Sequence, residues 1–388
     1  MKSESNSILE LGEIIETITP PKKIQTSEFL ETGNYPIVDQ SPPHVAGWTN
    51  DETSLVHPPK EGLIVFGDHT CVLKFQTKPF AQGADGIKII KVQKEINSHY
   101  IYAHLKAYPL LNDGYKRHFS ELKRLKILIP DLKIQDYISG IHQLIDAKID
   151  ANNALSKTLE NIAQAIFESW FIDFEPVKAK ISGEKPVGMD DATAALFPDA
   201  MVESEIGLIP KGWGVRSIGD SVIKQKVGKL FDSKTSFSSG SIPVLDQGKS
   251  GVVGFHDEEP GVIASPDAPL VVFANHTCSL RLISYPFSVI QNVFPLLGNK
   301  VDVVWLYFAV EGKQQFDSYK GHWPDFVLHK IIHPTEQATN AFRLTVEPLL
   351  KKKWLLDSQS NILANLRDSL IPRLISGELQ IPEEMLAS

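Results

Sequence analysis

The feature that most restricts how this chain can fold is an internal repeat. Residues 65–71 (VFGDHTC) recur as residues 272–278 (VFANHTC), and residues 36–40 (PIVDQ) recur as residues 243–247 (PVLDQ). Both pairs lie 207 residues apart, and after a three-residue deletion the match resumes 204 residues apart near the end of each copy. Two copies that keep one register over this distance predict two domains of the same fold.

Each copy is followed by a segment with the apolar spacing of a long helix. Seam positions alternate three and four residues apart, which is typical of a coiled coil. The expected seams are Ile141, Ile145, Lys148, Asn152, Leu155, Leu159, Ile162 and Ile166, and Phe342, Thr345, Leu349, Lys352, Leu356, Gln359, Leu363, Leu366 and Leu370. We expect the two helices to pair with each other; the alternative is that each helix packs on its own domain.

Within each domain, short apolar runs rich in β-branched and aromatic residues predict strands. These runs are residues 62–67, 71–75, 87–92 and 125–129, and in the second copy residues 269–274 and 278–283. Residues 98–106 and 303–310 have the composition of short helices added to them. The expected fold class is α+β, with two pseudo-repeated α+β domains that are each followed by a long α-helix.

Charge marks a boundary near the middle of the chain. Residues 173–205 carry eight acidic side chains against three lysines, in a chain whose net charge is −8, and they include several prolines and glycines. This composition indicates a connector. The expected limits are 1–135 for the first domain, 136–174 for the first long helix, 175–206 for the acidic connector, 207–335 for the second domain, 336–375 for the second long helix and 376–388 for a tail.

Composition narrows the class of protein further. A hydrophobic content of 42% with 22% charged residues is ordinary for a chain that buries sizeable cores. Two cysteines, Cys71 and Cys278, do not make a disulfide scaffold or a zinc site and are expected to be small buried apolar groups. Apolar stretches fall short of the ~18 residues that suggest a membrane span, so we expect a cytoplasmic protein.

The motifs of common enzymes are incomplete. Residues 248–250 (GKS) end like a phosphate-binding loop, but Pro243 stands where that loop needs glycine. Asp131, Asp146 and Lys148 have the spacing of a metal-dependent nuclease, yet the second copy lacks both carboxylates. No glycine-rich turn after a strand suggests a dinucleotide or S-adenosylmethionine pocket. We therefore expect no catalytic, metal or cofactor site in this chain.

The repeated turn is the first candidate binding element. It contains Asp68, His69 and Thr70 in one copy and Asn275, His276 and Thr277 in the other. A catalytic base needs its carboxylate, whereas a site that offers donors and acceptors to a varying target can exchange Asp for Asn. The alternative is that His and Thr satisfy a turn between two buried strands. Gln40 and Gln247 either offer an amide to a base edge or bond their own loop.

Basic residues form the second group of candidates, because cations interleaved with aromatic residues in loops suit phosphate and base contacts. The alternative is that such residues form an ordinary solvated face. This group comprises Lys22, Lys23, Lys116, Arg117 and His118 in the first copy, and Lys224, Lys226, Lys249, Lys320 and His322 in the second.

Several segments together resemble the specificity (S) subunit of type I restriction-modification systems. They are residues 167–180 (FESWFIDFEPVKAK), 196–199 (LFPD), 207–213 (GLIPKGW) and 366–379 (LRDSLIPRLISGEL). The resemblance covers nearly the whole chain. It departs at the first domain, where residues 9–13 are not preceded by the Pro-x-Gly-Trp type of entry that the second domain has.

The resemblance implies a non-catalytic subunit that recognises double-stranded DNA. Two target-recognition domains, held apart by an antiparallel coiled coil, would read a bipartite asymmetric target. The helices would dock two adenine methyltransferase (M) subunits, which flip the target base, and restriction (R) subunits. S-adenosylmethionine, ATP and Mg²⁺ are expected on those partners. The alternative is a coiled-coil scaffold with two protein-binding modules that does not contact DNA, and an enzyme dependent on Asp68 or Asp146 comes third.

Overall fold

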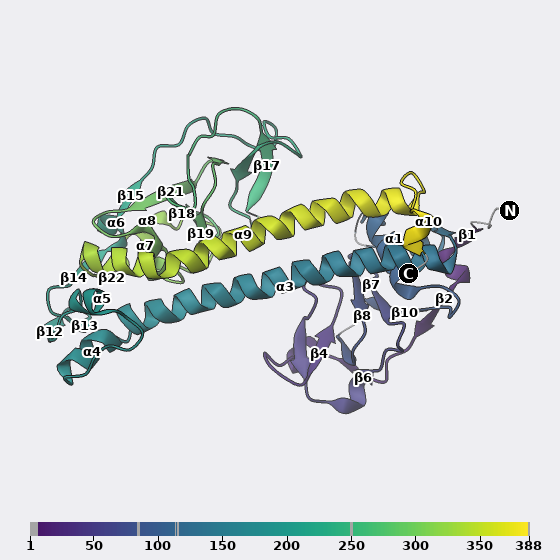
Figure 1. Cartoon of the computed structure of the whole chain (residues 1–388), viewed down its shortest axis with the longest axis horizontal. Coiled ribbons are helices and arrows are strands. Elements are labelled where there is room, and N and C mark those ends of the chain that lie inside the picture. Colours follow the sequence, from purple (N-terminus) through teal and green to yellow (C-terminus); the bar gives the residue numbers. More distant parts are fainter. Residues whose placement is uncertain (1–6, 84–85, 113, 115, 249–250, 387–388) are drawn as a thin grey trace. The chain divides into compact units, whose positions relative to one another are not determined.

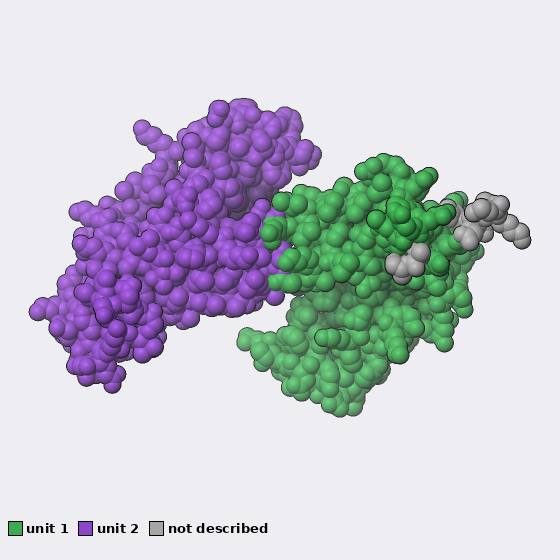
Figure 2. All heavy atoms as spheres, viewed as in Figure 1, with its two compact units in different colours: residues 1–151, 359–388 green, residues 152–358 purple. Residues whose placement is uncertain are grey.

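The repeat in the sequence is also a repeat in strand order. The computed structural model describes residues 7–83, 86–112, 114, 116–248 and 251–386. It divides into unit 1, which comprises Met1–Ala151 and Gln359–Ser388, and unit 2, which comprises Asn152–Ser358 (Figure 2). Each unit contains a four-stranded antiparallel sheet, in the order β2-β10-β7-β8 in unit 1 and β15-β21-β18-β19 in unit 2 (Figure 1).

These two sheets are built from corresponding parts of the repeat. In unit 1 the strands are β2 (Ile15–Ile18), β7 (Leu63–Gly67), β8 (Leu73–Gln76) and β10 (Ile87–Val92). In unit 2 they are β15 (Val222–Lys224), β18 (Leu270–Ala274), β19 (Leu280–Ile283) and β21 (Val293–Gly298). Every residue of β7 and of β18 is buried, as expected of central strands covered on both faces.

A second sheet in each unit carries the candidate glutamine loop. In unit 1 it has the order β3-β9-β4-β5, with β6 also on β9, from β3 (Lys23–Ile24), β4 (Tyr35–Val38), β5 (Gly47–Thr49), β6 (Leu55–Val56) and β9 (Phe80–Gly83). In unit 2 it has the order β17-β16-β20, from β16 (Ile242–Leu245), β17 (Val252–His256) and β20 (Ser288–Val289). Gln40 and Gln247 follow β4 and β16, each by two residues.

Short helices and two-stranded sheets complete the units. Unit 1 contains β1 (Ser7–Glu10) paired with β11 (Lys126–Ile129), helices α1 (Ser98–Ala107), α2 (Phe119–Lys123) and α10 (Glu383–Leu386), and 3-10 turns at Leu11–Glu13, Thr26–Glu28 and Glu52–Ser54. Unit 2 contains β14 (Gly214–Ser217) paired with β22 (Lys330–His333), and helices α6 (Ile218–Ser221), α7 (Val303–Val310) and α8 (Trp323–Phe326). The predicted α+β class is confirmed.

The two long helices are α3 (Leu132–Phe171) and α9 (Glu336–Ile375). In unit 1 the early part of α3, at Ile138, shares a core with the late part of α9, at Ile371 and Ile375. In unit 2 the late part of α3, at Phe167, packs on the early part of α9, at Phe342, with ring centroids 5.8 Å apart. The parts of the helices that belong to each unit therefore pair in antiparallel fashion (Figure 1).

The predicted seam was only partly correct. Lys148, Leu155 and Ile162 are exposed on α3, as are Thr345, Lys352, Gln359 and Leu366 on α9. The predicted positions Asn152, Phe342 and Leu356 are buried, and further buried positions lie at Ile138, His142, Ser156, Ala163 and Phe167 on α3, and at Val346, Leu350, Ser360 and Ile371 on α9. The spacing alone does not fix which stripe is buried, because these helices carry apolar side chains on more than one face.

The acidic connector is not merely a solvated link. It contains α4 (Glu175–Ile181), α5 (Asp191–Ala195) and β12 (Met201–Ser204), and β12 forms a hairpin with β13 (Gly207–Pro210). Val177 and Phe197 are buried in the core of unit 2. The segment leaves α3 through Phe174, whose φ of 56° places it in the left-handed region that commonly ends helices.

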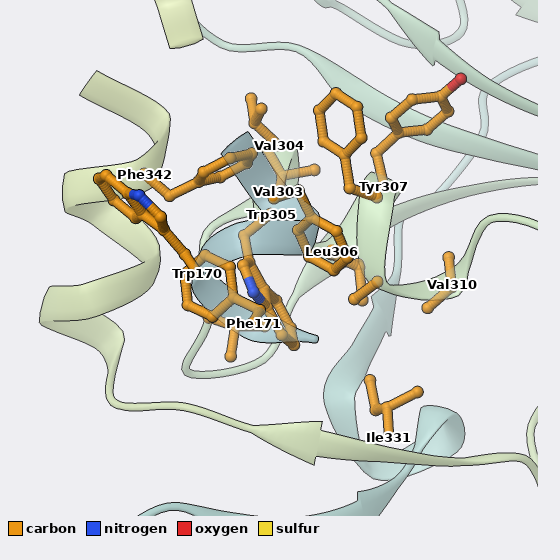
Figure 3. Close-up of a cluster of buried hydrophobic side chains, with 14 of the residues drawn as sticks. Trp170, Phe171, Val303, Val304, Trp305, Leu306, Tyr307, Val310, Ile331 and Phe342 are labelled. Carbon is orange, nitrogen blue, oxygen red and sulfur yellow. The ribbon is translucent and has the colours of Figure 1, made fainter. Parts of the chain in front are cut away.

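An aromatic cluster, which includes Phe197 of this segment, lies in the core of unit 2. The rings of Phe171 and Trp213 stack with centroids 5.7 Å apart, and Phe171 also meets Trp305 and Phe342 edge to face (Figure 3). Helix α7 lies in the same core and is buried at every position. The carboxylate of Asp302 begins this helix by accepting from the Val304 amide at 2.7 Å.

Candidate nucleic-acid interface

Three loops of unit 1 meet around His69. The turn between β7 and β8 carries His69 and Thr70, and the His69 Nδ1 atom lies 3.0 Å from the carbonyl oxygen of Lys116. The Thr70 hydroxyl donates to the carbonyl oxygen of Gln40 at 2.8 Å. Asn112 Nδ2 donates to the His69 carbonyl oxygen at 3.1 Å. These residues define loop cluster 1: Gln40, His69, Thr70, Asn112, Lys116 and Arg117.

Unit 2 contains the corresponding arrangement around His276. The His276 amide donates to Gln247 Oε1 at 2.8 Å, and His276 Nδ1 lies 2.8 Å from the carbonyl oxygen of Lys320. Because a carbonyl only accepts, Nδ1 carries the proton, and Nε2 accepts from Asn292 Nδ2 at 3.3 Å. Loop cluster 2 comprises Gln247, His276, Thr277, Asn292, Tyr319 and Lys320.

The two clusters differ in the groups that they expose. Tyr319 in cluster 2 is 86% exposed and stacks on His276 with ring centroids 5.2 Å apart. Among the described residues of cluster 1, the exposed neighbours are Asn112, Lys116 and Arg117; Tyr115, the counterpart of Tyr319, lies outside the described residues. The sequences differ where Arg117 corresponds to Gly321, because a guanidinium group can bond base edges and phosphates and glycine has no side chain to do so. The same backbone arrangement therefore presents different recognition chemistry in each unit.

Local backbone geometry explains why the turn has this sequence. Cys71 and Cys278 both have φ of 57°, and their amides donate to the carbonyl oxygens of Gly67 at 2.8 Å and Ala274 at 2.9 Å. Close packing also constrains Gly67, because a Cβ there would lie 2.3 Å from the Thr70 hydroxyl and 3.0 Å from Gln40 Cβ. The turn is thus closed by its own backbone bond and packs closely against the glutamine loop.

A cation supports each glutamine loop, buried Lys74 in unit 1 and partly buried Arg281 in unit 2. Lys74 Nζ donates to the carbonyl oxygen of Asp39 at 2.8 Å, and Arg281 Nη2 donates to that of Asp246 at 2.7 Å. Burial lowers the pKa of both cations. Sequence reasoning did not single out this pair, although the two residues are cations at the same repeat offset of 207.

Two predicted contact residues face inward. His118 and His322 have no exposed side-chain surface. Their Nε2 atoms lie 3.3 Å from the Gly114 carbonyl oxygen and 3.0 Å from the Ser318 carbonyl oxygen, respectively. In this conformation the two imidazoles shape the loops that carry Lys116 and Lys320, and they offer no group to a ligand.

The remaining predicted cations have varied surroundings. Lys22 forms an ion pair of 2.8 Å with Asp51, and Lys23 lies in β3. Lys224 Nζ lies 3.8 Å from the ring centroid of Trp323 and 4.0 Å from that of Phe294. Lys226 is exposed, and Lys249 lies outside the described residues.

Acidic neighbours partly neutralise the loop lysines. Lys116 pairs with Glu121 at 2.8 Å, and Lys320 lies between Asp317 at 3.2 Å and Asp325 at 3.1 Å. The hydrogen bonds to Asp325 and Asp317 raise the pKa of Lys320, so it keeps its positive charge. Asn275 is only 8% exposed, and its side chain supports the loop by accepting a hydrogen bond from the Trp323 amide.

The structure also bears on metal binding and on membrane insertion. In the described part of the chain no three His, Cys, Asp or Glu side chains are grouped to hold a metal ion. Likewise, none of the helices that the structure describes has both the length and the apolar composition to cross a bilayer.

Comparison with known proteins finds similarity to the specificity subunits of type I restriction enzymes. A model of the type I restriction modification DNA specificity domain matches residues 3–161. The chain is 24% identical over 331 residues to the type I restriction enzyme HindI specificity subunit of Haemophilus influenzae, a match that covers 67% of this chain and 70% of that protein. It is 26% identical over 289 residues to the MjaIX specificity subunit of Methanocaldococcus jannaschii, covering 68% of this chain and 63% of that one.

The fold is also similar to that of a specificity subunit. The crystal structure of a type I restriction-modification system S subunit from M. genitalium superposes with a TM-score of 0.54, over 96% of this chain and 97% of that one, at 14% sequence identity. At this identity the match reports the fold alone, which is two α+β domains with long helices. In sequence, including a domain match over residues 3–161, and in fold over nearly the whole chain, the protein is similar to the DNA specificity subunits of type I restriction-modification systems.

Proposed function

We propose that this subunit, which recognises DNA sequence and is non-catalytic, reads a bipartite asymmetric target with one half-site for each unit. The observation that carries this proposal is the repetition of the loop cluster. His69 and His276 make the same bond to the carbonyl oxygen of a loop lysine, Lys116 or Lys320, while the exposed groups around them differ. One framework with two sets of recognition groups suits two different half-sites.

The groups proposed to contact DNA are partly or fully exposed members of the two loop clusters, together with the exposed Lys226. Amide and imidazole groups at Gln40, His69, Gln247 and His276 would meet base edges, and Lys116, Arg117, Lys226 and Lys320 would meet phosphates. We leave His118 and His322 out of this set because both side chains are buried. Thr70 and Asn275 support the loops through their hydrogen bonds to Gln40 and Trp323.

The helix pair has a proposed role in spacing and assembly. Each of α3 and α9 has 40 residues, which corresponds to about 60 Å at ~1.5 Å per residue. A pair of that length would set the distance between half-sites. Exposed apolar side chains on both helices, including Leu144, Leu155, Leu344 and Ile362, suit the docking of partner helices.

Specificity subunits assemble with methyltransferase and restriction subunits. Here we propose two methyltransferase subunits, with S-adenosylmethionine on them and with ATP and Mg²⁺ on the restriction subunits. The proposed location is the cytoplasm. A net charge of −8 is compatible with DNA binding when cations are concentrated in the contact loops, since phosphate contacts are local.

The proposal is tested by mixing the chain with its methyltransferase subunit, labelled S-adenosylmethionine and a randomised duplex library. We expect methyl groups at adenines of one split sequence with a fixed spacer, and binding that weakens as salt rises. The scaffold alternative predicts neither. Methylation at an unsplit sequence would retain DNA recognition but overturn the assignment of one half-site to each unit.

A further inference from the structure

Unit 1 contains an open apolar groove whose repeat counterpart in unit 2 is smaller. The groove has a volume of about 390 Å³ and is lined by Ile8, His104, Tyr108, residues 125–128, Ile375 and Ser376. Residues 126–128 of β11 correspond to residues 330–332 of β22, and Ile375 corresponds to Phe171, all at the repeat offset of 204. Those counterparts line the smaller cavity in unit 2, whose volume is about 110 Å³.

Two differences account for the smaller cavity in unit 2. Its wall carries a larger side chain at one position, because Phe171 stands where unit 1 has Ile375. It is also lined by Ile206, which lies in the turn of the β12–β13 hairpin. The hairpin lies beside β22 (Figure 1). The chain itself therefore supplies an aliphatic side chain, 45% exposed, at the rim of the cavity in unit 2.

An ion pair fixes the same hairpin at this position. Glu205, which precedes Ile206, forms an ion pair with Lys330 of β22. The counterpart of Lys330 in unit 1 is Lys126, an exposed residue at the rim of the open groove. Among the residues that the structure describes in unit 1, none belongs to a hairpin equivalent to β12–β13. Within the described residues of unit 1, the lysine and the groove are thus present without an equivalent acidic and aliphatic pair.

The groove of unit 1 also leaves apolar and polar groups without partners. Ile8 is 64% exposed and Tyr108 is 44% exposed at its rim. His104 lines it and is only 7% exposed, and its Nδ1 atom has no hydrogen-bond partner from another residue. Burial lowers the pKa of this histidine to about 4, so the imidazole is neutral near pH 7.

We propose that this groove binds a partner protein through a tight turn in which an acidic residue precedes a branched aliphatic residue. The aliphatic side chain would enter the groove between Ile8, Tyr108 and Ile375, and the carboxylate would pair with Lys126. The arrangement copies the one that Glu205 and Ile206 make in unit 2. Burial of the aliphatic group supplies most of the affinity, and the ion pair sets its orientation. The inference does not depend on DNA recognition.

The experiment uses the full chain and a fluorescent peptide that copies residues 201–210, closed into a ring so that the turn is held. Fluorescence anisotropy should show saturable binding. Changing Glu205→Lys or Ile206→Asp in the peptide should weaken binding at least about tenfold, since each places a charge against a like charge or in an apolar site. Lys126→Glu and Ile8→Asp in the protein should do the same.

The control variant is Lys133→Glu, which makes the same charge change at an exposed position outside the groove. It should bind the peptide as the parent protein does. Thermal unfolding of each variant confirms that the protein is folded, and the exposed positions of Lys126 and Ile8 make loss of the fold an unexpected outcome. Absence of saturable binding, or binding indifferent to both Lys126→Glu and Ile8→Asp, overturns the proposal.

Sedimentation of the chain alone tests whether a second copy of the chain occupies the groove. If the protein forms dimers that Lys126→Glu and Ile8→Asp dissociate, the groove is an interface between copies of this chain and the proposal of a distinct partner is overturned. A monomer that binds the peptide supports it.

Discussion

Asp68 Oδ1 accepts a hydrogen bond of 2.8 Å from the backbone N–H of Phe119, at the start of α2. In unit 2, Asn275 Oδ1 accepts the equivalent bond of 2.7 Å from Trp323. The carbonyl oxygens of the same two residues accept from the amides of His118 and His322, both at 2.8 Å. Each side chain is used as an acceptor, which is a property that Asp and Asn share. Their exchange between the copies therefore reflects a structural role.

The first prediction concerns this bond. Asp68→Asn keeps the acceptor and should change the free energy of unfolding by less than about 0.5 kcal/mol, whereas Asp68→Ala should cost about 1–2 kcal/mol because it leaves a helix-start amide unsatisfied. Urea unfolding measures both. The methylation directed by the assembled complex should survive Asp68→Asn. A loss of methylation with the fold intact would instead favour a reacting carboxylate.

The second prediction concerns the paired helices. Asn152 is 2% exposed on α3, and its Nδ2 atom has no hydrogen-bond partner. Asn152→Leu should raise the free energy of unfolding by about 1 kcal/mol or more, since it removes an unsatisfied buried amide and adds apolar burial. Lys148→Leu is the matched control at an exposed position of the same helix and should change little. Destabilisation by Asn152→Leu would show that the amide is satisfied in solution.

Asn152 also shows where sequence reasoning succeeds and where it fails. Strand β10 and helix α7 were predicted with the limits that the structure has, because short apolar runs bounded by polar residues have few alternatives. Asn152 was correctly placed in the seam, but Lys148 and Leu155 were not. Spacing determines that a helix has a stripe, and packing against other elements determines which stripe is buried.

The candidate site was predictable to a similar degree. The repeat identified the turns at His69 and His276, and the structure shows that each meets its glutamine loop and its lysine loop. Burial of His118 was not predictable, because its neighbours are distant in the sequence. The role of Lys74 was missed because a lysine in a strand resembles a residue on a solvated face, whereas here it is 3% exposed.

The third prediction is a pH dependence in unit 1. His99 and His142 face each other with ring centroids 5.2 Å apart, and the rings of Phe75 and Tyr102 lie beside His99. Burial, and then the neighbouring His142, lower the pKa of His99 to about 4. Burial also lowers the pKa of His142, against the opposing effect of Asp146, which is paired with Arg367.

The sign of the effect follows from proton binding. An unfolded histidine has a pKa of about 6.5, so between pH 7 and pH 5 the unfolded state takes up a proton that folded His99 does not. The free energy of unfolding of unit 1 should therefore fall over this range, by on the order of 1–2 kcal/mol for His99. His99→Phe should reduce that slope and His57→Phe, at an exposed position, should not. Hydrogen exchange of α1 amides measures it, and an unchanged slope in His99→Phe would contradict the prediction.

The fourth prediction concerns phosphate contacts. Arg117 is exposed in loop cluster 1. Arg117→Ala should weaken DNA binding by the assembled complex and reduce the magnitude of the slope of log affinity against log salt by about 1, as expected for one lost phosphate contact. Lys22→Ala should have a smaller effect because Asp51 already pairs with that lysine. Lys133→Ala serves as the control, and an Arg117→Ala slope equal to that of the control would remove Arg117 from the interface.

The most direct test of the account is a half-site analysis of methylation by the assembled complex. It compares the parent chain with Gln40→Ala and His69→Ala in unit 1 and with Gln247→Ala and His276→Ala in unit 2, on duplexes in which one half-site at a time is altered. The account predicts that the unit 1 changes relax or abolish recognition of one half only, and that the unit 2 changes affect only the other. Changes from both units acting on the same half-site would contradict it, and so would specific methylation that is indifferent to all four.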